Sequence, residues 1–419
     1  MKDTVAVILA AGRGTRMKSE TPKVLHMVLG RPIIGYVLDS VRNAGIKDII
    51  TVTGYGNDIL KKFLKDETRV VVQKELLGSG DAVGTAKKDL RGYSGDILVI
   101  CGDTPLIKAK TIKELIDKHR NSNASLTVLT AILKDPTGYG RIERDGNKSV
   151  VRIVEEERAS LYDEVINEVN VGTYCFNAED LFVSLAGVRP DNKKKEFFLT
   201  DTVEILRKHG KLVESVKMKD PSEMIGINTR KDLAEATRIL KDSVLEELMS
   251  GGVTIEDPQT TTIYPGARIG RDTIIHPNTV IESGVEIGER CHIGPFARLR
   301  PEVRIGDDVE IGNFVELVRT SVGDGSKVKH HTYLGDTAVG KFVNIGAGTI
   351  TANFDGKKKS KTVIEDKAFV GVGAILVAPV RIGSGATVGA GCVVLKNRNV
   401  PKGATVVGVP ARILKKQKG

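Results

Sequence analysis

One stretch decides the fold of the second half of the chain: residues 263–299 read IYPGARIGRDTIIHPNTVIESGVEIGERCHIGPFARL. An isoleucine or leucine returns at every sixth residue, and the pattern runs on past the stretch to Leu317. The ten positions are Ile263, Ile269, Ile275, Ile281, Ile287, Ile293, Leu299, Ile305, Ile311 and Leu317. The residue four places after each of them is small or β-branched, from Ala267 to Ser321. This period predicts a hexapeptide parallel β-helix, in which three hexads make one triangular coil with the aliphatic side chains stacked inside.

The repeat is interrupted once. Its register slips by one residue at Val322 and at Val339, breaks over residues 351–363, and resumes at Ile364. The break is rich in lysine, and long insertions in solenoids commonly carry function, so we expect a functional loop that leaves the prism. Hexapeptide helices wind left-handed, an exception to the right-handed crossover rule, although the period alone does not fix the hand.

The composition fits a narrow prism interior and a second domain. The chain has 419 residues, more than one core holds, so two or three domains are expected. Hydrophobic residues make up 40% and charged residues 28%, which is typical of a soluble globular protein and excludes wholesale disorder. There are 45 glycines, only 4% aromatic residues and no tryptophan. Small and β-branched residues in regular layers explain these values.

Charge and cysteine usage narrow the class of function. The formal charge of +10 is scattered, and few aromatic residues are available for base stacking, so phosphorylated small molecules are favoured over nucleic acid as partners. Four cysteines lie far apart without metal-ligand or disulfide spacing, which is typical of a reducing compartment. We find no apolar run of about 18 residues and no signal peptide, and we therefore expect a cytoplasmic protein without a membrane span.

The first half alternates strand and helix patterns. Short apolar runs at residues 5–9, 47–53, 69–73, 97–100 and 125–133 predict strands, with a helix at 33–41 and further helical patterns between. Such alternation predicts an α/β, Rossmann-like domain with a mostly parallel sheet, whose ligands bind beyond the carboxyl ends of the strands. A helix at 229–249 precedes Gly251-Gly252. We therefore divide the chain into an α/β domain (1–228), a linker helix (229–252) and a β-helix domain (253–419).

A glycine-rich loop follows the first strand. Gly12 and Gly14 let the backbone approach a ligand closely, and Arg16 and Lys23 add positive charge for phosphates. The loop lacks the ending of a Walker motif and the third glycine of a dinucleotide fingerprint. The whole run 9–26 resembles the sugar-1-phosphate nucleotidyltransferases. Within them it is most similar to the uridylyltransferase half of the bifunctional enzymes of UDP-N-acetylglucosamine synthesis (N-acetylglucosamine-1-phosphate uridylyltransferase/glucosamine-1-phosphate acetyltransferase).

This resemblance implies a first set of site residues. The binding set for UTP and the UDP-sugar is Leu9, Ala10, Ala11, Gly12, Lys23, Gln73, Gly78, Ser79, Gly140, Glu155, Asn170 and Asn228. Asp103 and Asn228 would hold Mg²⁺, a hard cation that prefers oxygen ligands. Arg16 and Lys23 would act in catalysis by neutralising the triphosphate. No general base is expected, because the sugar phosphate is already an anionic nucleophile. Ser79 stands where the family more often has threonine.

Motifs at residues 291–301, 312–316, 330–336, 344–350 and 353–356 resemble the acetyltransferase domain of the same family. The resemblance implies that His330 is the base that deprotonates an amine for attack on acetyl-CoA. The acetyl acceptor would be bound by Arg300, Tyr333, Asn344 and Lys359, and acetyl-CoA by Asn353, Phe354 and Ala390. His331 is interpreted as a packing or surface residue. The family packs its β-helices as trimers, so we expect a homotrimer.

The acetyltransferase half departs from the family at three places. Val318 stands where a phosphate-binding lysine is usual, Val372 replaces a serine, and the family's longer tail is missing. Arg319 is adjacent to Val318, but on a strand its side chain should point elsewhere. We therefore keep two alternatives beside acetylation of glucosamine-1-phosphate. The β-helix acetylates another amino sugar-1-phosphate, such as galactosamine-1-phosphate, or it serves only assembly or regulation.

Overall fold

The computed structural model describes residues 3–65, 67–190 and 195–414. The chain divides into two compact units, Met1–Thr237 and Arg238–Gly419. The division falls within α8 (Arg230–Ser250), the helix predicted at 229–249. The finer division at residues 228 and 252 stays a prediction. None of the helices in the described ranges is long and apolar enough to cross a membrane.

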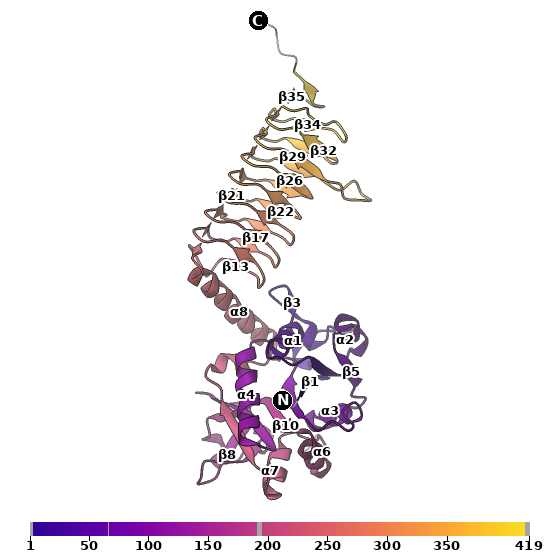
Figure 1. Cartoon of the computed structure of the whole chain (residues 1–419), viewed down its shortest axis with the longest axis vertical. Coiled ribbons are helices and arrows are strands. Elements are labelled where there is room, and N and C mark those ends of the chain that lie inside the picture. The colour runs from indigo at the N-terminus through magenta and orange to yellow at the C-terminus, as the bar shows by residue number, and fades with distance from the viewer. Residues whose placement is uncertain (1–2, 66, 191–194, 415–419) are drawn as a thin grey trace. The chain divides into compact units, whose positions relative to one another are not determined.

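The first unit is built on a nine-stranded sheet (Figure 1). Its main path runs β11 (Val213–Lys217), β7 (Leu126–Ile132), β10 (Glu168–Asn177), β6 (Asp96–Cys101), β1 (Thr4–Ala10), β4 (Asp48–Thr53) and β5 (Arg69–Val72). Neighbours on this path are parallel except for β10, which is antiparallel to both β6 and β7. The hairpin of β8 (Arg141–Arg144) and β9 (Val150–Val154) joins at β10, and β2 (Met27–Val28) pairs with β3 (Arg31–Pro32) separately. The expected mostly parallel sheet is confirmed, whereas β10 was not foreseen.

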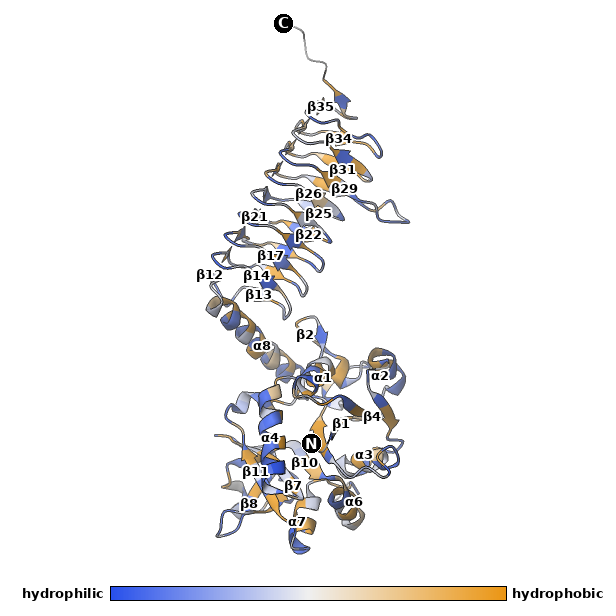
Figure 2. Ribbon diagram, viewed as in Figure 1, coloured by the Kyte–Doolittle hydropathy of each residue, from blue (hydrophilic) through white to orange (hydrophobic). Residues whose placement is uncertain are grey.

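Helices cover both faces of this sheet. One face packs against α1 (Ile33–Asn43), α2 (Asn57–Leu64) and α4 (Ala109–Ser122). The other face packs against α3 (Ser79–Thr85), α6 (Ala178–Gly187) and α7 (Asp201–Lys208), and α5 (Leu161–Glu164) is a single turn. Strand β1 is coloured as hydrophobic in Figure 2, and its side chains belong to the clusters on both faces of the sheet, which is typical of a parallel strand between two helical layers. This burial leaves the ends of the strands as the places where polar groups can meet a ligand.

The second unit is a parallel β-helix with three faces. Face 1 holds β12 (Thr254–Ile255), β15 (Ile274–Ile275), β18 (His292–Ile293), β21 (Glu310–Asn313), β24 (Lys327–His330), β27 (Asn344–Ile345), β30 (Phe369–Val370), β33 (Thr387–Val388), β35 (Thr405–Val407) and β36 (Arg412–Ile413). Face 2 holds β13 (Thr262–Ile263), β16 (Val280–Ile281), β19 (Arg298–Leu299), β22 (Glu316–Val318), β25 (Tyr333–Gly335), β28 (Ile350–Ala352), β31 (Ile375–Val377) and β34 (Val393–Val394). Face 3 holds β14 (Arg268–Ile269), β17 (Glu286–Ile287), β20 (Arg304–Ile305), β23 (Ser321–Val322), β26 (Thr337–Val339), β29 (Thr362–Ile364) and β32 (Val380–Ile382).

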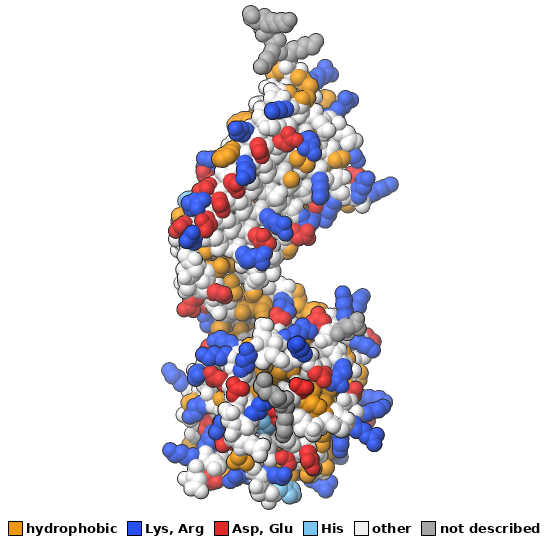
Figure 3. Space-filling model, in the orientation of Figure 1, with side chains coloured by type: hydrophobic (Ala, Val, Ile, Leu, Met, Phe, Trp, Pro, Cys, Tyr) orange, Lys and Arg blue, Asp and Glu red, His pale blue; other side chains and the backbone are white. Residues whose placement is uncertain are grey.

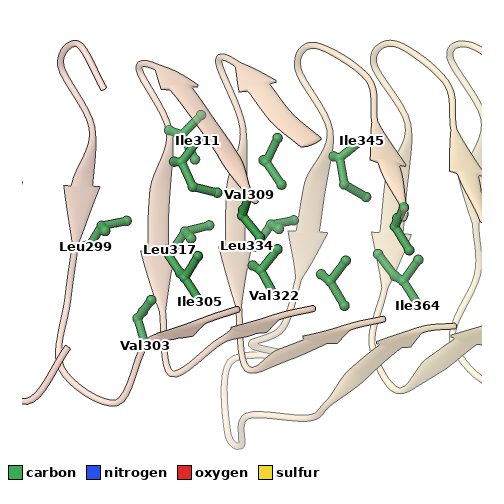
Figure 4. Close-up of a cluster of buried hydrophobic side chains, with 14 of the residues drawn as sticks. Leu299, Val303, Ile305, Val309, Ile311, Leu317, Val322, Leu334, Ile345 and Ile364 are labelled. Atoms are coloured by element: carbon green, nitrogen blue, oxygen red, sulfur yellow. The ribbon is translucent and has the colours of Figure 1, made fainter. Parts of the chain in front are cut away.

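The strand register confirms the six-residue period. Ile275 pairs with Ile293, and Ile293 with Ile311, so one coil takes three hexads. Ile311 then pairs with Val328, one residue short of a full coil, which is the predicted slip. The aliphatic side chains stack along the inside of the prism (Figure 4). Corners such as Asp272, with φ of 60°, take a left-handed backbone so that the chain can turn between faces.

The lysine-rich loop leaves the prism between β28 and β29 (Figure 1). It covers residues 353–361, which is narrower than the predicted break at 351–363. Thr351 stays inside the prism and is fully buried. Its hydroxyl oxygen accepts the backbone N–H of Gly335 at 2.8 Å, so the buried polar group keeps a hydrogen-bond partner. We refer to residues 353–361 as the lysine loop below.

The outer surface of the prism carries opposite charges in pairs along successive coils (Figure 3). Arg290 bonds Asp308, and Lys327 bonds Glu310 at 2.8 Å. The positive excess of the chain is therefore partly neutralised in local pairs. This arrangement fits the view that the net charge does not form one nucleic-acid surface.

Candidate active sites

A cavity of about 400 Å³ opens at the carboxyl ends of β1 and β6. Nine of the residues predicted from the sequence line it: Leu9, Ala10, Ala11, Gly12, Lys23, Gln73, Gly78, Ser79 and Asp103. Strand β1 ends at Ala10 and β6 ends at Cys101, so the glycine loop and Asp103 follow neighbouring strands. The fold thus gathers residues that lie up to about 90 positions apart at one edge of the sheet.

Lys23 lies between two oxygen-bearing side chains. Its ammonium bonds the Asp103 carboxylate and donates to Oδ1 of Asn228 at 3.0 Å. The backbone N–H of Ile227 donates to the Asp103 carbonyl at 2.9 Å, which ties the segment before α8 to the end of β6. Two hard oxygen donors therefore face one cation. Such a pair fits Mg²⁺, which is commonly held by one or two protein oxygens together with substrate phosphates.

Gln73 and Gly78 shape the opposite side of the cavity. The Gln73 side chain is buried and donates to the Gly78 carbonyl at 3.1 Å and to Asp81 at 2.7 Å. Gly78 has a φ of 100°, and a side chain there would lie 2.7 Å from the carbonyl oxygen of Phe197. The hydroxyl of Ser79 accepts the N–H of Leu199 at 3.0 Å. These contacts hold the loop in place, and Gly78 and Ser79 line the cavity.

Gly140, Glu155 and Asn170 form a second group that does not line the cavity. The N–H of Asn170 donates to the Gly140 carbonyl at 2.8 Å, and Thr200 donates to Glu155 at 2.6 Å. Burial raises the pKa of Glu155 above its ordinary value. Cys101 connects this group to the cavity, because its thiol lies 3.6 Å from the carbonyl of Gly172 on the same strand as Asn170.

Three features of this region escaped sequence reasoning. Arg13 lines the cavity, whereas Arg16 is exposed and is not among the lining residues within the described ranges. Glu196 also lines it, from a segment far away in the chain. Cys101 lines it too, and burial, with the Asp103 carboxylate, raises its thiol pKa to about 12. The position of Arg13 in the glycine loop could have indicated its role, while no sequence motif pointed to Glu196.

In the β-helix, His330 is oriented by Asn313. The two residues pair between β21 and β24, and Nδ1 of His330 lies 2.9 Å from Oδ1 of Asn313. An amide oxygen can only accept a hydrogen bond, so Nδ1 carries the proton and Nε2 is left with a lone pair. His330 is exposed, as a residue that meets a substrate must be. Asn313 was quoted in the sequence motif, but this role was not foreseen.

His331 has different surroundings. It sits at the corner after β24 with φ of 46°, and its ring stacks on Phe314 with centroids 4.9 Å apart. Phe314 in turn stacks on Phe296 at 5.2 Å. His331 is therefore the last member of an aromatic column on a corner of the prism. This contact accords with its interpretation as a packing residue.

One chain does not bring the four predicted acceptor-binding residues to one face. Arg300, directly after β19, and Tyr333 in β25 belong to face 2, while Asn344 in β27 lies on face 1. Outward side chains on different faces of a prism diverge. Lys359 lies on the lysine loop. Arg300 donates to Glu316 at 3.2 Å, and its buried Nε has no hydrogen-bond partner among the described atoms.

The predicted donor-binding residues lie at or beyond the lysine loop. Asn353 is buried at the start of the loop, and Phe354 is 58% exposed and bridges to Lys359 across it. Ala390 is in the coil above Val372, where the N–H of Gly391 donates to the Val372 carbonyl at 2.7 Å. Val318 is buried, with only 3% of its surface exposed. Arg319 pairs with Asp336 at 2.6 Å, in agreement with the expectation that it points elsewhere.

Family models match both units. A model described as nucleotidyl transferase matches residues 5–238, and one described as bacterial transferase hexapeptide (six repeats) matches residues 266–301, 284–319 and 361–396. The α/β cavity and the prism together therefore define a two-part transferase, with a nucleotidyl transferase unit followed by a hexapeptide transferase unit.

Individual relatives cover nearly the whole chain. The bifunctional protein GlmU of Pelotomaculum thermopropionicum is 46% identical over 411 residues, 90% of each chain. The GlmU proteins of Geobacillus sp. (strain WCH70) and Shouchella clausii are 43% and 45% identical. They cover 95% and 93% of this chain and 94% and 93% of their own. The chain belongs to the GlmU family of bifunctional proteins.

Proposed function

We propose that the chain makes UDP-N-acetylglucosamine in two steps. The β-helix transfers acetyl from acetyl-CoA to glucosamine-1-phosphate, and the first unit transfers UMP from UTP to the product and releases pyrophosphate. The observation that carries the second step is Lys23 between Asp103 and Asn228 at the edge of a nucleotide-sized cavity. Membership of the GlmU family supports the pairing of the two activities.

For uridylyl transfer, this chain's residues bind and neutralise anions. Asp103 and Asn228 would hold Mg²⁺, which supplies positive charge to the phosphates when bound. Lys23 and Arg13, which both line the cavity, meet the triphosphate, Arg16 adds positive charge farther along the same loop, and the glycine loop offers backbone N–H groups to the phosphates. Gln73, Gly78 and Ser79 face the base, while Gly140, Glu155 and Asn170 meet the sugar. The sugar phosphate attacks the α-phosphate as an anion, so positioning rather than a base lowers the barrier.

For acetyl transfer, His330 removes a proton from the substrate ammonium so that the amine can attack the thioester. Asn313 holds Nδ1–H, which keeps Nε2 as the accepting nitrogen. Arg300, Tyr333, Asn344 and Lys359 would bind the sugar phosphate, and Asn353, Phe354 and Ala390 the acetyl-CoA.

The acceptor stays the open question of this half. Val318 is buried and stands where the family usually has a phosphate-binding lysine, and Arg319 is paired with Asp336. Neither position therefore offers a positive charge to the acceptor phosphate on face 2. Every amino sugar-1-phosphate carries the same phosphate, so this observation does not distinguish between acceptors, and acetylation of galactosamine-1-phosphate or of several amino sugar phosphates stays the second candidate. Release of free CoA thiol with each amino sugar phosphate decides between them. Absence of thiol release with all of them would leave the prism an assembly or regulatory element.

The two-site assignment is tested by Asp103→Ala and Asn228→Ala. Each variant should lose Mg²⁺-dependent formation of the UDP-sugar by about 10²-fold or more. The substitution removes an oxygen ligand that would hold Mg²⁺, and the positive charge of the ion is what offsets the repulsion between the two anions. Acetyl transfer should be unchanged, because distant sites act independently. Lys327→Ala, on the outside of the prism, is the matched control. Equal loss of both activities in a folded Asp103→Ala protein would contradict the assignment.

We also propose that three copies of the chain complete the acetyl-transfer site. Exposed apolar side chains gather on the upper coils of the prism: Ile350, Phe369, Val372 and Ile375. Asn344 diverges from Arg300 and Tyr333, so a neighbouring prism is needed to bring such residues to one substrate. Analytical ultracentrifugation at micromolar concentration should give a trimer. A monomer with full acetyl transfer would refute the shared site.

A further inference from the structure

The lysine loop is attached to the prism at Asp336. Asn353, at the start of the loop, donates from Nδ2 to Oδ2 of Asp336 at 2.5 Å. Thr362, directly after the loop, donates its backbone N–H to the carbonyl of Asp336 at 3.2 Å. Within the loop, the N–H of Ser360 donates to the Asn353 carbonyl at 2.8 Å. Both ends of the loop therefore meet at one residue of the coil below.

Arg319 holds the Asp336 carboxylate in place. Its Nε donates to Oδ1 at 2.6 Å and its terminal nitrogen to Oδ2 at 2.9 Å, a two-bond fork. Arg319 sits at the corner after β22, with φ of 47°. The fork holds the pKa of Asp336 below its ordinary value against the effect of burial, and the Asn353 bond and the charge of Lys359 act in the same direction. Asp336 is thus an oriented carboxylate at neutral pH.

The neighbouring residue, Gly335, brings the loop to the candidate site. A side chain at Gly335 would lie 2.6 Å from Nδ2 of Asn353 and 2.6 Å from the hydroxyl of Tyr333. These two side chains therefore close over the glycine and lie beside each other. The junction that anchors the lysine loop also places Asn353, a donor-site residue, next to Tyr333, an acceptor-site residue.

We propose that Asp336 is a positioning residue for acetyl transfer. Kept ionised by Arg319, it fixes Asn353 and the lysine loop, which carries Phe354 and Lys359, beside Tyr333. This inference rests on the proposed acetyl transfer at the same site. It also means that Arg319 is bound to Asp336 and does not replace the positive charge of the phosphate-binding lysine that the family usually has at the position of Val318.

The test compares Asp336→Asn with a matched control. Arg290 holds Asp308 by the same fork, with bonds of 2.8 and 3.0 Å, at another corner of the prism, where Asp308 makes no bond to the loop among the described contacts. Asp308→Asn therefore weakens an ion pair of the same forked geometry, at a more exposed corner, without touching the loop. Two readouts apply to both variants: the rate of trypsin cleavage within the loop, and kcat and KM for acetyl-CoA.

Loss of a charge-assisted anchor should speed loop cleavage and raise KM for acetyl-CoA by about tenfold each in Asp336→Asn. The pH–rate profile should keep its shape, because His330 and Asn313 are untouched. Arg319→Ala should act in the same direction, and Arg319→Lys should recover part of the loss. Asp308→Asn should match the wild type, and uridylyl transfer should be unchanged in every variant.

Wild-type cleavage and KM in Asp336→Asn would overturn the proposal, and so would equal loosening in Asp308→Asn. If Asp336→Asn does not fold by circular dichroism, the folded Arg319→Ala protein decides the question by the same two readouts. If the wild type acetylates no amino sugar phosphate, the proposed function fails, while the trypsin readout still decides whether Asp336 positions the loop.

Discussion

At the scale of single residues, the two adjacent histidines differ in what they touch. His330 meets Asn313, and His331 stacks on Phe314. His330→Ala should lower acetyl transfer by about 10²–10⁴-fold at saturating substrate, because a general base is removed. His331→Ala should cost little beyond packing. Steady-state kinetics with uridylyl transfer as the internal control measures both variants. If acetyl transfer is lost in His331→Ala and kept in His330→Ala, the base is His331.

His26 gives the first unit an acid-sensitive contact. Its Nδ1 lies 3.2 Å from a terminal nitrogen of Arg230, which can only donate, and its buried Nε2 has no hydrogen-bond partner among the described atoms. Burial, with the charge of Arg230, lowers the pKa of His26 below 6.5. The unfolded chain therefore binds this proton more readily than the folded one. The contribution of His26 to the free energy of unfolding should be constant above about pH 7 and should fall as the pH drops below about 6.5.

The measurement for His26 is urea unfolding of the wild type and His26→Gln between about pH 5 and pH 8. The difference in free energy of unfolding between the wild type and His26→Gln should be constant above about pH 7 and should fall at lower pH, because only the wild type carries this titrating group. His209→Gln is the control, because His209 bonds only a helix carbonyl near the surface within the described contacts. A wild-type and a His26→Gln curve of the same acid slope would contradict the assignment.

At the scale of elements, β21 and β24 touch at Gly312. A side chain at Gly312 would overlap the carbonyl of Lys329, the residue before His330. Gly312→Ala should therefore push β24 outward and move His330 away from Asn313. We expect acetyl transfer to fall by about tenfold or more while uridylyl transfer is unchanged, since small displacements of a catalytic group are costly. Gly84→Ala on α3, where a side chain meets open space, should leave both activities unchanged. Wild-type acetyl transfer in Gly312→Ala would show that the strands adjust freely.

At the scale of the whole molecule, the two units carry separate hydrophobic cores. The prism has one stacked column, and the first unit has one cluster on each side of its sheet. Calorimetry should therefore resolve two transitions. UTP with Mg²⁺ should raise the midpoint of one, and acetyl-CoA that of the other, because each ligand stabilises only the unit that binds it. Leu317→Ala, which empties part of the prism column, should lower only the transition raised by acetyl-CoA, by about 2–5 kcal/mol of stability. One transition that responds to both ligands would contradict this separation.

Much of the architecture follows from the sequence by itself, because its causes are local. A large aliphatic residue at every sixth position, from Ile263 to Leu317, places one side chain inside each prism face, and the shortened coil at Val328 shows as a slipped period. The apolar run at 5–9 followed by Gly12 predicts a buried strand with a ligand loop; the structure shows the strand as Thr4–Ala10 and places Gly12 at the cavity.

Only the tertiary structure decided which distant groups meet. Strand β10 was not predicted, because polar residues interrupt the apolar pattern of this central antiparallel strand. Nothing in the local pattern says that Lys23 reaches Asn228, that Asn313 orients His330, or that Asp336 receives both ends of the lysine loop. These contacts join residues 17 to 205 positions apart, and a hydrogen bond depends on the final separation of two atoms. Periodicity determines which side chains are buried, but the packing of strands and loops determines which polar atoms come within bonding distance.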